Sequence, residues 1–507
     1  MKELYITTPI YYVNDIPHIG HAYTSIISDT ISRFFKLNNY NVKFLTGTDE
    51  HGLKVEIAAR KKKSNPQKYV DTISKNFLNL SEVLNLSNDD FIRTTELRHK
   101  ESVKFFWEKL VKNNQVYLDK YEGWYSIKDE TFYQEKELMK KNGSFETIDG
   151  EKVEWVKEES YFFKLSRWQN KLLEFYETNE NFILPKSRKN EVVSFVKSGL
   201  KDLSISRTSF SWGIKVPDKD NHVIYVWIDA LANYITSLDY PNINKHGLSL
   251  WKNSIHIIGK DILKFHAIYW PALLMGANLD PPKQIFAHGW WTNEGKKISK
   301  SLGNTIDPLE IVKKFGLDQI RYFLLREITL GQDGDFSEKA LISRINADLS
   351  NNLGNLIQRT LKLNDKYFEN KFPFDLNENQ EFKILEYGYK LLDEVESNMR
   401  LFQINKALEN IWNFISKLNQ YIDKTEPWKL FKENKDETAI VLSEIIESIR
   451  LLGIILQPFM PDSSSKILDT LNINKKHRGF DSFNKHNIIK KGTKLKEVKQ
   501  LFPRYNV

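Results

Sequence analysis

Two histidines, His18 and His21, stand where a predicted strand gives way to a predicted helix. The apolar residues 4–7 read as a buried parallel strand, and residues 21–36 carry apolar side chains at helical spacing. Backbone N–H groups are free at the start of a helix, and its dipole favours negative charge there. Because Gly20 has no Cβ, a flat ligand can approach the backbone closely. The stretch suits a polyphosphate; exposed histidines capping a helix, or a metal site, are the alternatives.

A second stretch, rich in lysine and serine, covers residues 296–301 and follows a predicted strand at 285–288. Three more polar stretches also follow predicted strands, at residues 49–51, 227–230 and 259–261. In open α/β sheets, ligands bind outside the carboxyl ends of the strands. Because all five stretches follow strands in this way, we expect them to meet in one active site.

The pattern of strands and helices predicts the domains. Strand and helix alternate over residues 1–115 and again over 221–295, where a strand is predicted at 223–227. This alternation predicts an α/β fold with a doubly wound, Rossmann-like parallel sheet. Residues 116–220 change to short strands and charged turns and read as an insertion, whose aromatic side chains pack in a core or stack on unpaired bases. Residues 341–473 carry apolar side chains at spacings of three and four, which predicts a helix bundle.

The composition bounds the class of protein. A chain of 507 residues is too long for one core, so two to four domains are expected. The absence of cysteine excludes disulfides and cysteine-bound zinc or iron–sulfur sites, and it fits a reducing compartment. We find no signal peptide and no apolar run long enough to span a membrane, so we expect a soluble, cytoplasmic protein.

The formal net charge of +8 is concentrated near the end of the chain. Residues 475–507 hold ten Lys and Arg against two Asp and Glu, which leaves the rest of the chain neutral overall. We therefore assign residues 474–507 to a basic tail. Two interpretations stay open, a solubilising surface segment and a contact to a polyanion.

The histidine stretch together with Lys297-Ile298-Ser299-Lys300-Ser301 resembles the paired signatures of class I aminoacyl-tRNA synthetases. Further motifs narrow the resemblance to the methionyl-tRNA synthetases and extend it over nearly the whole chain. These motifs are Pro9-Ile10-Tyr11-Tyr12, Thr46-Gly47-Thr48-Asp49-Glu50-His51-Gly52, Tyr225-Val226-Trp227-Ile228-Asp229-Ala230, Gly259-Lys260-Asp261-Ile262, Phe265-His266, Trp270-Pro271, and Asn355 with Arg359. Ile298 stands where the family usually has methionine, which is a mild variation.

The resemblance implies a two-step reaction. The carboxylate of methionine attacks the α-phosphate of ATP, giving methionyl-adenylate and pyrophosphate, and the 3′ end of tRNA(Met) then takes the methionyl group for translation initiation and elongation. The implied catalytic residues are His18, His21, Lys297, Lys300 and Arg207, with Mg²⁺ sharing the phosphate charge. The implied ATP-binding residues are His18, Gly20, His21, Gly259, Asp261, Ile298 and Lys300.

The resemblance also implies a methionine pocket. Asp49 would pair with the substrate ammonium group, and aromatic rings suit its polarizable sulfur. The residues implied around the thioether are Ile10, Tyr12, Trp227, Ala230, Tyr234, Ile262, His266 and Trp270. By periodicity alone these side chains would be assigned to the core.

For tRNA, the resemblance makes residues 341–473 an anticodon-binding domain and residues 296–340 a signature loop with a stem-contact region. The implied anticodon readers are Asn355, Arg359 and Trp428. An aromatic face and two directional hydrogen-bonding groups suit splayed, single-stranded bases. The alternative is that Trp428 packs between helices as a core residue.

The chain departs from many family members in two ways. Ser126 stands where the first cysteine of a zinc knuckle is expected, so we expect no structural zinc and an insertion that is held together by packing. Many bacterial members also append a tRNA-binding, dimer-forming domain, and without it we expect a monomer.

Two other functions are alternatives to methionine–tRNA ligation. Synthetases for leucine, isoleucine or valine carry a large editing domain where this chain has a small insertion. A non-catalytic RNA-binding paralogue is disfavoured by the intact histidine and lysine signatures. The sequence leaves open the kinetic constants, the preference between initiator and elongator tRNA, protein partners, the source organism and the role of the basic tail.

Overall fold

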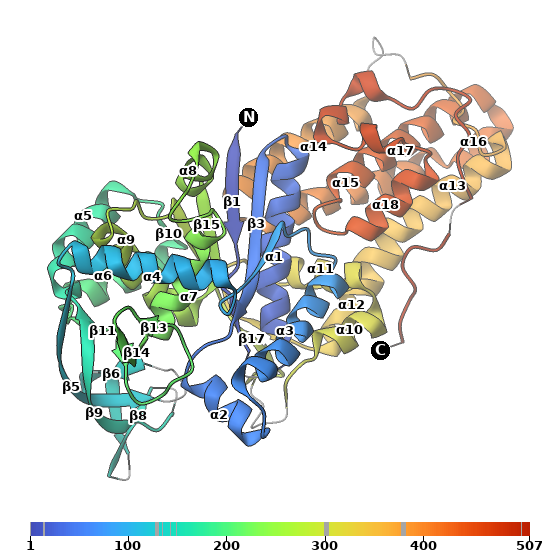
Figure 1. The fold of residues 1–507 in the computed structure, drawn as a ribbon. Helices are drawn as coiled ribbons and strands as arrows, with labels where there is room; N and C mark the ends of the chain where they lie inside the picture. The colour runs from blue at the N-terminus through green and yellow to red at the C-terminus, as the bar shows by residue number, and fades with distance from the viewer. Residues whose placement is uncertain are drawn as a thin grey trace. The chain divides into compact units, whose positions relative to one another are not determined.

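The chain divides into two compact units, coloured along the chain in Figure 1. The computed structural model describes residues 2–13, 16–126, 131–133, 135–141, 143–148, 150–298, 304–376, 382–497 and 499–506, without the side chains of Tyr121, Thr131, Phe132, Glu158 and Lys297. The sheet unit comprises Glu3–Ser28 and Val42–His288, and the helical unit comprises Met1–Lys2, Asp29–Asn41 and Gly289–Val507. Helix α1 (Ile19–Leu37) contributes its first half to the sheet unit and its second half to the helical unit.

A seven-stranded sheet forms the centre of the sheet unit, in the order β10-β16-β15-β1-β3-β2 with β4 on β3. The pairs β1–β15, β15–β16, β10–β16, β2–β3 and β3–β4 are parallel. The strands are β1 (Glu3–Thr7), β2 (Tyr11–Tyr12), β3 (Asn41–Asp49), β4 (Asp90–Arg93), β10 (Ile183–Leu184), β15 (Ser254–Gly259) and β16 (Gln284–His288). The predicted Rossmann-like parallel sheet is confirmed.

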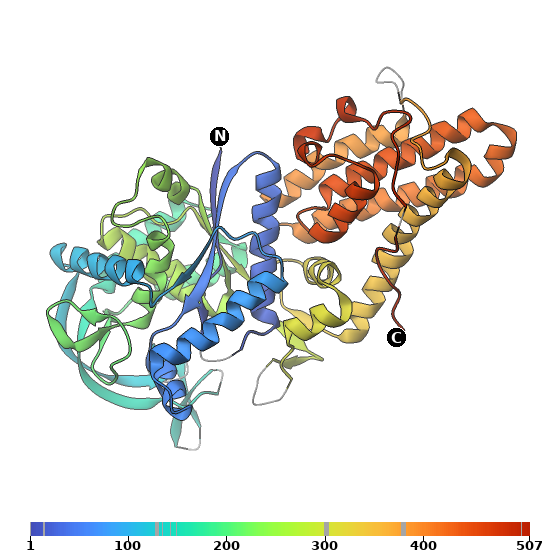
Figure 2. The same ribbon diagram turned by 45° about the vertical axis from the view of Figure 1, so that its right-hand side comes forward.

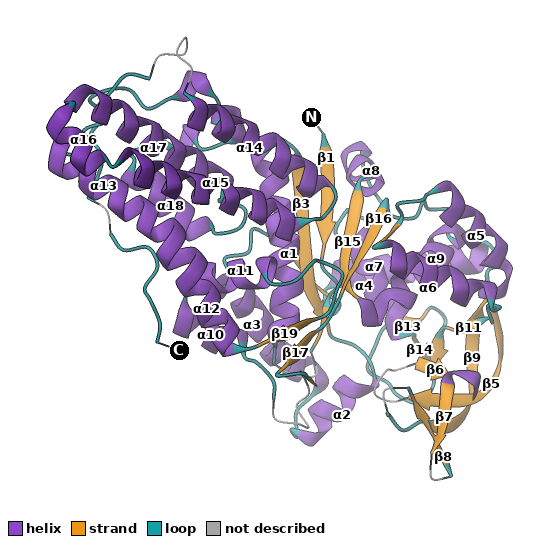
Figure 3. Ribbon diagram, turned by 180° about the vertical axis from the view of Figure 1, so that it is seen from behind, coloured by secondary structure: helices purple, strands orange, loops and turns teal. Residues whose placement is uncertain are grey.

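The helices of the sheet unit surround this sheet (Figure 3). They are α2 (Leu53–Lys61), α3 (Pro66–Val83), α4 (Leu97–Lys112), α5 (Gln169–Thr178), α6 (Lys186–Lys197), α7 (Val226–Thr236), α8 (Lys245–Lys252) and α9 (Trp270–Gly276), with a π-helical turn at Phe265–Tyr269 before α9. Buried side chains from the sheet, α4, α7 and α9 form one continuous hydrophobic core. This core supports the carboxyl ends of the strands.

One predicted strand is wrong. Residues 223–227 do not form a parallel strand: the first two end the antiparallel strand β14 (Lys219–Ile224), and α7 starts at Val226. β14 pairs antiparallel with β12 (Ser206–Arg207) and β13 (Lys215–Val216) in a separate small sheet. Trp227 therefore lies in the first turn of a helix.

The range predicted as an insertion contains a long two-stranded ribbon, β5 (Val116–Ser126) and β9 (Glu154–Phe163). β6 (Thr131–Tyr133) and β11 (Leu203–Ser204) extend the ribbon, and β7 (Leu138–Lys141) pairs with β8 (Ser144–Thr147), as Figure 3 shows. Strand β10 lies within the same range of the sequence but belongs to the parallel sheet.

The helical unit begins with a small sheet of β17 (Trp291–Asn293), β18 (Lys296–Lys297) and β19 (Gly334–Phe336). Figure 2 shows the long helices between residues 355 and 455 lying alongside one another, which confirms the predicted bundle. Several helices follow the small sheet in the helical unit. They are α10 (Pro308–Phe315), α11 (Leu317–Arg326), α12 (Glu338–Arg344), a π-helical stretch (Ile345–Gly354), α13 (Asn355–Phe368), α14 (Lys383–Arg400), α15 (Ile404–Thr425), α16 (Pro427–Glu433), α17 (Lys435–Ile455) and α18 (Pro461–Thr470).

The basic segment after α18 is anchored to the bundle. Phe480 and Phe483 are buried, and the Arg450 guanidinium on α17 donates to the carbonyl oxygen of Ser482 at 2.8 Å. The buried Glu447 carboxylate pairs with Arg450 and accepts the N–H of Ile489 at 3.3 Å. Among the described residues, no helix is both long and apolar enough to cross a membrane.

Candidate active site

The two histidines of the first motif lie against each other at the start of α1. Their ring centroids are 3.9 Å apart, and both side chains are half-buried. The N–H of His18 donates to Nδ1 of His21 at 3.0 Å, and the N–H of Gly20 donates to Nδ1 of His18 at 3.1 Å. A Cβ on Gly20 would lie 2.9 Å from Cε1 of His18, so glycine is needed for this folded-back arrangement.

These hydrogen bonds fix which ring nitrogens of His18 and His21 carry protons. Each Nδ1 accepts a backbone N–H, so the neutral imidazole carries its proton on Nε2. Burial lowers the pKa of His18, against the opposing charge of Asp261, and burial lowers the pKa of His21 well below its usual value. At neutral pH the pair therefore offers two neutral N–H donors, which suit phosphate oxygens.

The ends of β15 and β16 lie beside this helix start. Asp261 lies in the 3-10 turn Lys260–Ile262 after β15 and is exposed. It is close enough to His18 for its charge to favour a higher pKa of that imidazole. Nε2 of His288, the last residue of β16, lies 2.8 Å from Oγ1 of Thr24 on α1. Two of the predicted stretches, residues 18–21 and 259–261, thus lie close together in the sheet unit.

Asp49 and Tyr12 are direct neighbours on parallel strands. Tyr12 on β2 is in register with Asp49, the last residue of β3, and the N–H of Val13 donates to the Asp49 carbonyl at 3.1 Å. The Asp49 side chain is 8% exposed, whereas Tyr12 is half-buried. A buried carboxylate at a strand end is suited to bind a cation such as an ammonium group.

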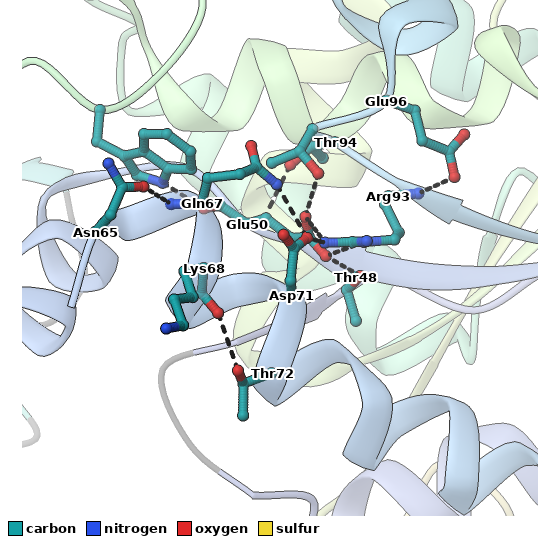
Figure 4. A network of polar contacts seen from close by, with 12 residues as sticks. Thr48, Glu50, Asn65, Gln67, Lys68, Asp71, Thr72, Arg93, Thr94 and Glu96 are labelled. Atoms are coloured by element: carbon teal, nitrogen blue, oxygen red, sulfur yellow. Dashed lines mark hydrogen bonds and ion pairs between the residues drawn. The ribbon is translucent and has the colours of Figure 1, made fainter. Parts of the chain in front are cut away.

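Glu50, next to Asp49, anchors the end of β3 (Figure 4). Its fully buried carboxylate accepts Nε of Arg93 at 2.7 Å and Oγ1 of Thr48 at 2.8 Å. The N–H of Glu50 donates to Oγ1 of Thr94 at 2.9 Å, and Arg93 also pairs with Asp71 at 2.5 Å. This network holds the loop after β3 in one position.

Helix α7 supplies one wall of the predicted methionine pocket. Trp227, Ala230 and Tyr234 lie on one face of α7, because residues three and four apart share a helix face. The Trp227 ring stacks on Phe265 with centroids 3.7 Å apart. The predicted pocket residues divide by burial: Ile10, Tyr12, Trp227 and Ile262 are half-buried, whereas Ala230, Tyr234, His266 and Trp270 are buried. The four half-buried residues pack against the hydrophobic core to which Tyr234 and Trp270 belong.

His266 is held in one tautomer within this pocket. Its Nδ1 lies 2.9 Å from the carbonyl oxygen of Ile262, to which it must donate. Its Nε2 then accepts from the Tyr234 hydroxyl at 2.8 Å. Burial lowers the pKa of His266 to about 4, despite the opposing effects of the Ile262 carbonyl and Asp261. The His266 imidazole is therefore neutral at pH 7.

Arg207, predicted as an active-site arginine, lies in the small sheet of β12 and β14. It is 2% exposed, and it donates to Oγ of Ser204 at 2.8 Å and to the Ser206 carbonyl at 2.7 Å. Its guanidinium lies 4.6 Å from the centroid of the Tyr225 ring. It lines a cavity of about 100 Å³ that Lys264 and Tyr269 also border.

The lysine–serine signature belongs to the helical unit. Lys297 pairs with Thr292 in the β17–β18 hairpin, and Ile298 follows it in an irregular segment. Lys300, the second predicted lysine, lies outside the described residues. The structure therefore leaves the predicted roles of these three residues as predictions.

The structure brings two of the three predicted anticodon readers together. The Arg359 guanidinium on α13 lies 4.7 Å from the centroid of the Trp428 ring on α16, and it pairs with Asp423 at 2.7 Å. Asn355 is exposed and lies one turn before Arg359 on the same face of α13. Trp428 is half-buried, so this ring is not enclosed in the core of the bundle.

Sequence reasoning missed two features of the pocket. Phe265, which stacks on Trp227, was noted as part of a motif but not assigned to the site. Asp229 and His51 also lie in motifs, and they form a buried hydrogen bond between Oδ2 and Nδ1 at 2.6 Å. The signal available in each case was adjacency to a predicted site residue.

Within the described residues, no three His, Cys, Asp or Glu side chains gather as a metal centre requires. The expectation of a zinc-free protein stays a prediction.

Comparisons with known proteins show the family to which the chain is similar. The family described as "tRNA synthetases class I (M)" matches residues 4–144 and 142–361, and the "anticodon binding domain of methionyl tRNA ligase" matches residues 376–506. A methionine–tRNA ligase of Rickettsia felis is 53% identical over 99% of this chain and 98% of its own length. One from Brucella suis is 47% identical over 99% of this chain and 98% of its own length.

A solved structure extends the similarity to the fold. The methionyl-tRNA synthetase of Mycobacterium tuberculosis in complex with methionyl-adenylate superposes with a TM-score of 0.96. It is 42% identical in sequence over 99% of this chain and 100% of its own. The matched families cover the parallel-sheet domain with its strand-end site and most of the helical bundle. The chain therefore belongs to the methionine–tRNA ligases, class I aminoacyl-tRNA synthetases that activate methionine with ATP and join it to tRNA.

Proposed function

We propose that this chain activates methionine at the strand ends of the sheet unit, with the residues predicted from its motifs. The observation that carries the proposal is the placement of Asp49 beside Tyr12, which packs with Trp227 of α7 against the same hydrophobic core. The buried carboxylate would bind the ammonium group, and the neutral rings would enclose the thioether. The relative from Mycobacterium tuberculosis, solved with methionyl-adenylate, supports this assignment.

His18 and His21 would position ATP for attack on its α-phosphate. Both imidazoles are neutral, with N–H donors that can bind phosphate oxygens as negative charge develops there. Gly259 and Asp261, at the end of β15, would accommodate the nucleoside, with Asp261 accepting a ribose hydroxyl. We place Arg207 among the catalytic residues from the motif alone.

The lysine signature would bind the β- and γ-phosphates. Lys297, Ile298 and Lys300 belong to this signature, and the cationic side chains of Lys297 and Lys300 would neutralise the pyrophosphate leaving group. Mg²⁺ would arrive with ATP as part of the substrate, because it keeps most of its ligands from phosphates and water. This chemistry needs no dedicated protein cage for the metal.

On the helical unit, we propose that Asn355, Arg359 and Trp428 read the anticodon of tRNA(Met). The exposed amide, the half-buried ring and the guanidinium above it provide the stacking face and hydrogen bonds that unpaired bases need. We further propose a cytoplasmic monomer that serves both initiation and elongation.

Amino-acid-dependent ATP–pyrophosphate exchange tests the activation step. Across the twenty amino acids, only methionine should support fast exchange. Lys300→Ala should slow adenylate formation by about 10²–10³-fold, the scale for loss of one transition-state donor, with little change in methionine affinity. Single-turnover kinetics measures this, and adenylation at the wild-type rate would refute the assignment of Lys300.

A further inference from the structure

A buried carboxylate on α7 holds two histidines from two other segments. Asp229 is fully buried, with Oδ2 2.6 Å from Nδ1 of His51 and Oδ1 2.7 Å from Nε2 of His99. His51 follows β3, and His99 lies on α4. Both imidazoles are themselves buried, so one side chain connects the β3 loop, α4 and α7 inside the core.

The carboxylate is ionised in this setting. Burial alone raises the pKa of Asp229, but the charge and N–H of His51, followed by those of His99, outweigh it and lower the pKa to about 2. An ionised acceptor takes a hydrogen bond from each ring at a separate oxygen, which fixes both rings in angle as well as distance. Removing one member of such a buried set leaves the others unsatisfied.

The β3 loop is fastened from a second side. The His51 ring packs edge-on against Trp212, with centroids 5.4 Å apart. Nε1 of Trp212 donates to the Glu50 carbonyl at 2.6 Å, and the N–H of Gly52 donates to the Trp212 carbonyl at 3.1 Å. The Glu50 carboxylate is tied to Arg93 (Figure 4). Of these ties, only the bond from His51 to Asp229 joins the loop to α7.

This link spans the two ends of the proposed methionine site. His51 comes two residues after Asp49, and Asp229 lies between Trp227 and Ala230. We propose that Asp229 is a positioning residue for methionine: through His51 it holds the ammonium-binding Asp49 at a fixed distance from the thioether wall on α7. The inference rests on the proposed function of Asp49.

The Asp229→Asn variant keeps the size of the side chain and removes its charge. One imidazole must then accept from the amide, so the spacing between the β3 loop and α7 relaxes. We expect the KM for methionine in pyrophosphate exchange to rise about 10- to 100-fold, the scale for a misplacement near 1 Å. The KM for ATP should stay within about twofold, because the link touches no proposed ATP residue.

A double-mutant cycle separates this inference from the proposed function. Asp49→Asn alone should raise the methionine KM, because it removes the proposed partner of the ammonium group. In the Asp49→Asn background, Asp229→Asn should raise the methionine KM by less than about a further threefold, since a positioning residue acts through the group that it positions. If Asp49→Asn leaves the methionine KM unchanged, the assignment of Asp49 fails, and the inference fails with it. If Asp49→Asn raises the KM but Asp229→Asn does not, or the two effects multiply, only the inference is overturned.

Substitutions of His51 give a second test that does not depend on Asp229→Asn folding. His51→Asn places an amide N–H near the position of Nδ1 and should retain a methionine KM within about threefold of wild type. His51→Ala removes the donor and should reproduce the loss seen for Asp229→Asn. Equal methionine KM values for the two His51 variants would overturn the inference.

A matched control tests whether any buried carboxylate has this effect. Asp318, on α11 of the helical unit, is 3% exposed and accepts the N–H of Ser463 at 2.5 Å. Asp318→Asn should lower the melting temperature while the methionine KM stays at the wild-type value. A rise in methionine KM equal to that of Asp229→Asn would show a general effect of stability and would overturn the positioning role.

Discussion

The proposed methionine pocket and the proposed anticodon surface use polar side chains in opposite ways. In the pocket, Asp49 and His266 are buried, and the His266 ring is fixed by hydrogen bonds at both nitrogens. On the anticodon surface, Asn355 is exposed, while Arg359 and Trp428 are half-buried and rest on each other. The first site is organised by the fold itself, and the second presents groups to a partner.

This difference indicates where each site obtains its binding energy. A small, flexible amino acid is recognised best by a preorganised pocket, because the pocket side chains are already ordered before the ligand binds. Splayed RNA bases bring their own stacking surfaces, so exposed groups suffice until the RNA arrives. Changes in the pocket should therefore disturb both reaction steps, whereas changes on the anticodon surface should disturb only the step that uses tRNA.

The largest expected effect tests the pocket. Asp49→Ala removes the proposed charge partner of the substrate and should lower kcat/KM for methionine by about 10²–10³-fold, as for loss of one partner of a buried ion pair. Pyrophosphate exchange and tRNA charging should fall together, because the second step needs the product of the first. Wild-type exchange in Asp49→Ala would remove the distinction drawn between the two sites.

The next effect tests the anticodon surface. Trp428→Ala and Arg359→Ala should lower tRNA charging about 10- to 100-fold, since stacking contributes about 1–3 kcal/mol per base. Pyrophosphate exchange and the melting temperature should stay near wild type, because Trp428 is half-buried. Parallel measurement of both activities and of a melting curve decides the outcome.

Trp412 provides the matched control for Trp428. It is 6% exposed on α15, its ring lies 4.3 Å from that of Tyr322, and its Nε1 donates to the Asp348 carbonyl at 3.3 Å. Trp412→Ala should cost about 3–5 kcal/mol of stability, as for other large-to-small changes in a core. If Trp428→Ala melts as early as Trp412→Ala, then Trp428 is a core residue and the anticodon assignment fails.

The sequence predicted the architecture well where periodicity was clear and failed where packing decided the outcome. The parallel sheet and the bundle followed from strand–helix alternation and from helical spacing. Residues 223–227 are rich in β-branched and aromatic side chains, so propensity indicated a strand. The structure starts α7 at Val226, because tertiary packing overrides so weak a preference.

The site shows the same limit. The position of Asp49 at a strand end followed from its place after an apolar run. The partnership of Asp229 with both His51 and His99 depends on three segments that are far apart in the chain. No local spacing encodes such a contact, although Asp229 lies next to Ala230, a residue that the motifs did assign to the site.

A smaller effect concerns acid stability. The pKa of His266 is lowered by burial to about 4 in the folded protein, below the usual value of 6.5. Its contribution to stability is therefore fully present above pH 6.5 and is lost as the pH falls toward 4, because the unfolded chain binds the proton more tightly. In that window the free energy of unfolding should fall by about 1 kcal/mol per pH unit from this group.

Denaturant unfolding at several pH values measures the acid effect. His266→Gln should be less stable than wild type at pH 7 but lose less stability between pH 6.5 and 4, since an amide does not titrate. Arg359→Gln on the anticodon surface should not change how steeply the free energy of unfolding falls with pH, because a guanidinium stays protonated throughout this range. Identical slopes for wild type and His266→Gln would show that His266 does not titrate as a buried neutral ring.

The smallest expected effect is that of zinc removal. We expect side-chain packing, not a metal ion, to stabilise the tip of the insertion, where β7 and β8 lie next to the β5–β9 ribbon. The Trp124 ring lies 4.7 Å from Phe145 and 5.2 Å from Trp155, so aromatic contacts join the β5–β9 ribbon to β8. Each such aromatic pair contributes about 0.5–1.5 kcal/mol to stability, in addition to the contribution from the apolar area that it buries. A zinc-selective chelator, with Mg²⁺ kept in excess for ATP, should therefore leave the melting temperature, pyrophosphate exchange and tRNA charging unchanged.

Trp124→Ala, unlike the chelator, should destabilise the tip. Faster hydrogen exchange over β7 and β8 would detect this change. Because structural zinc contributes directly to folding, one tightly held zinc per chain with early melting on chelation would contradict this account.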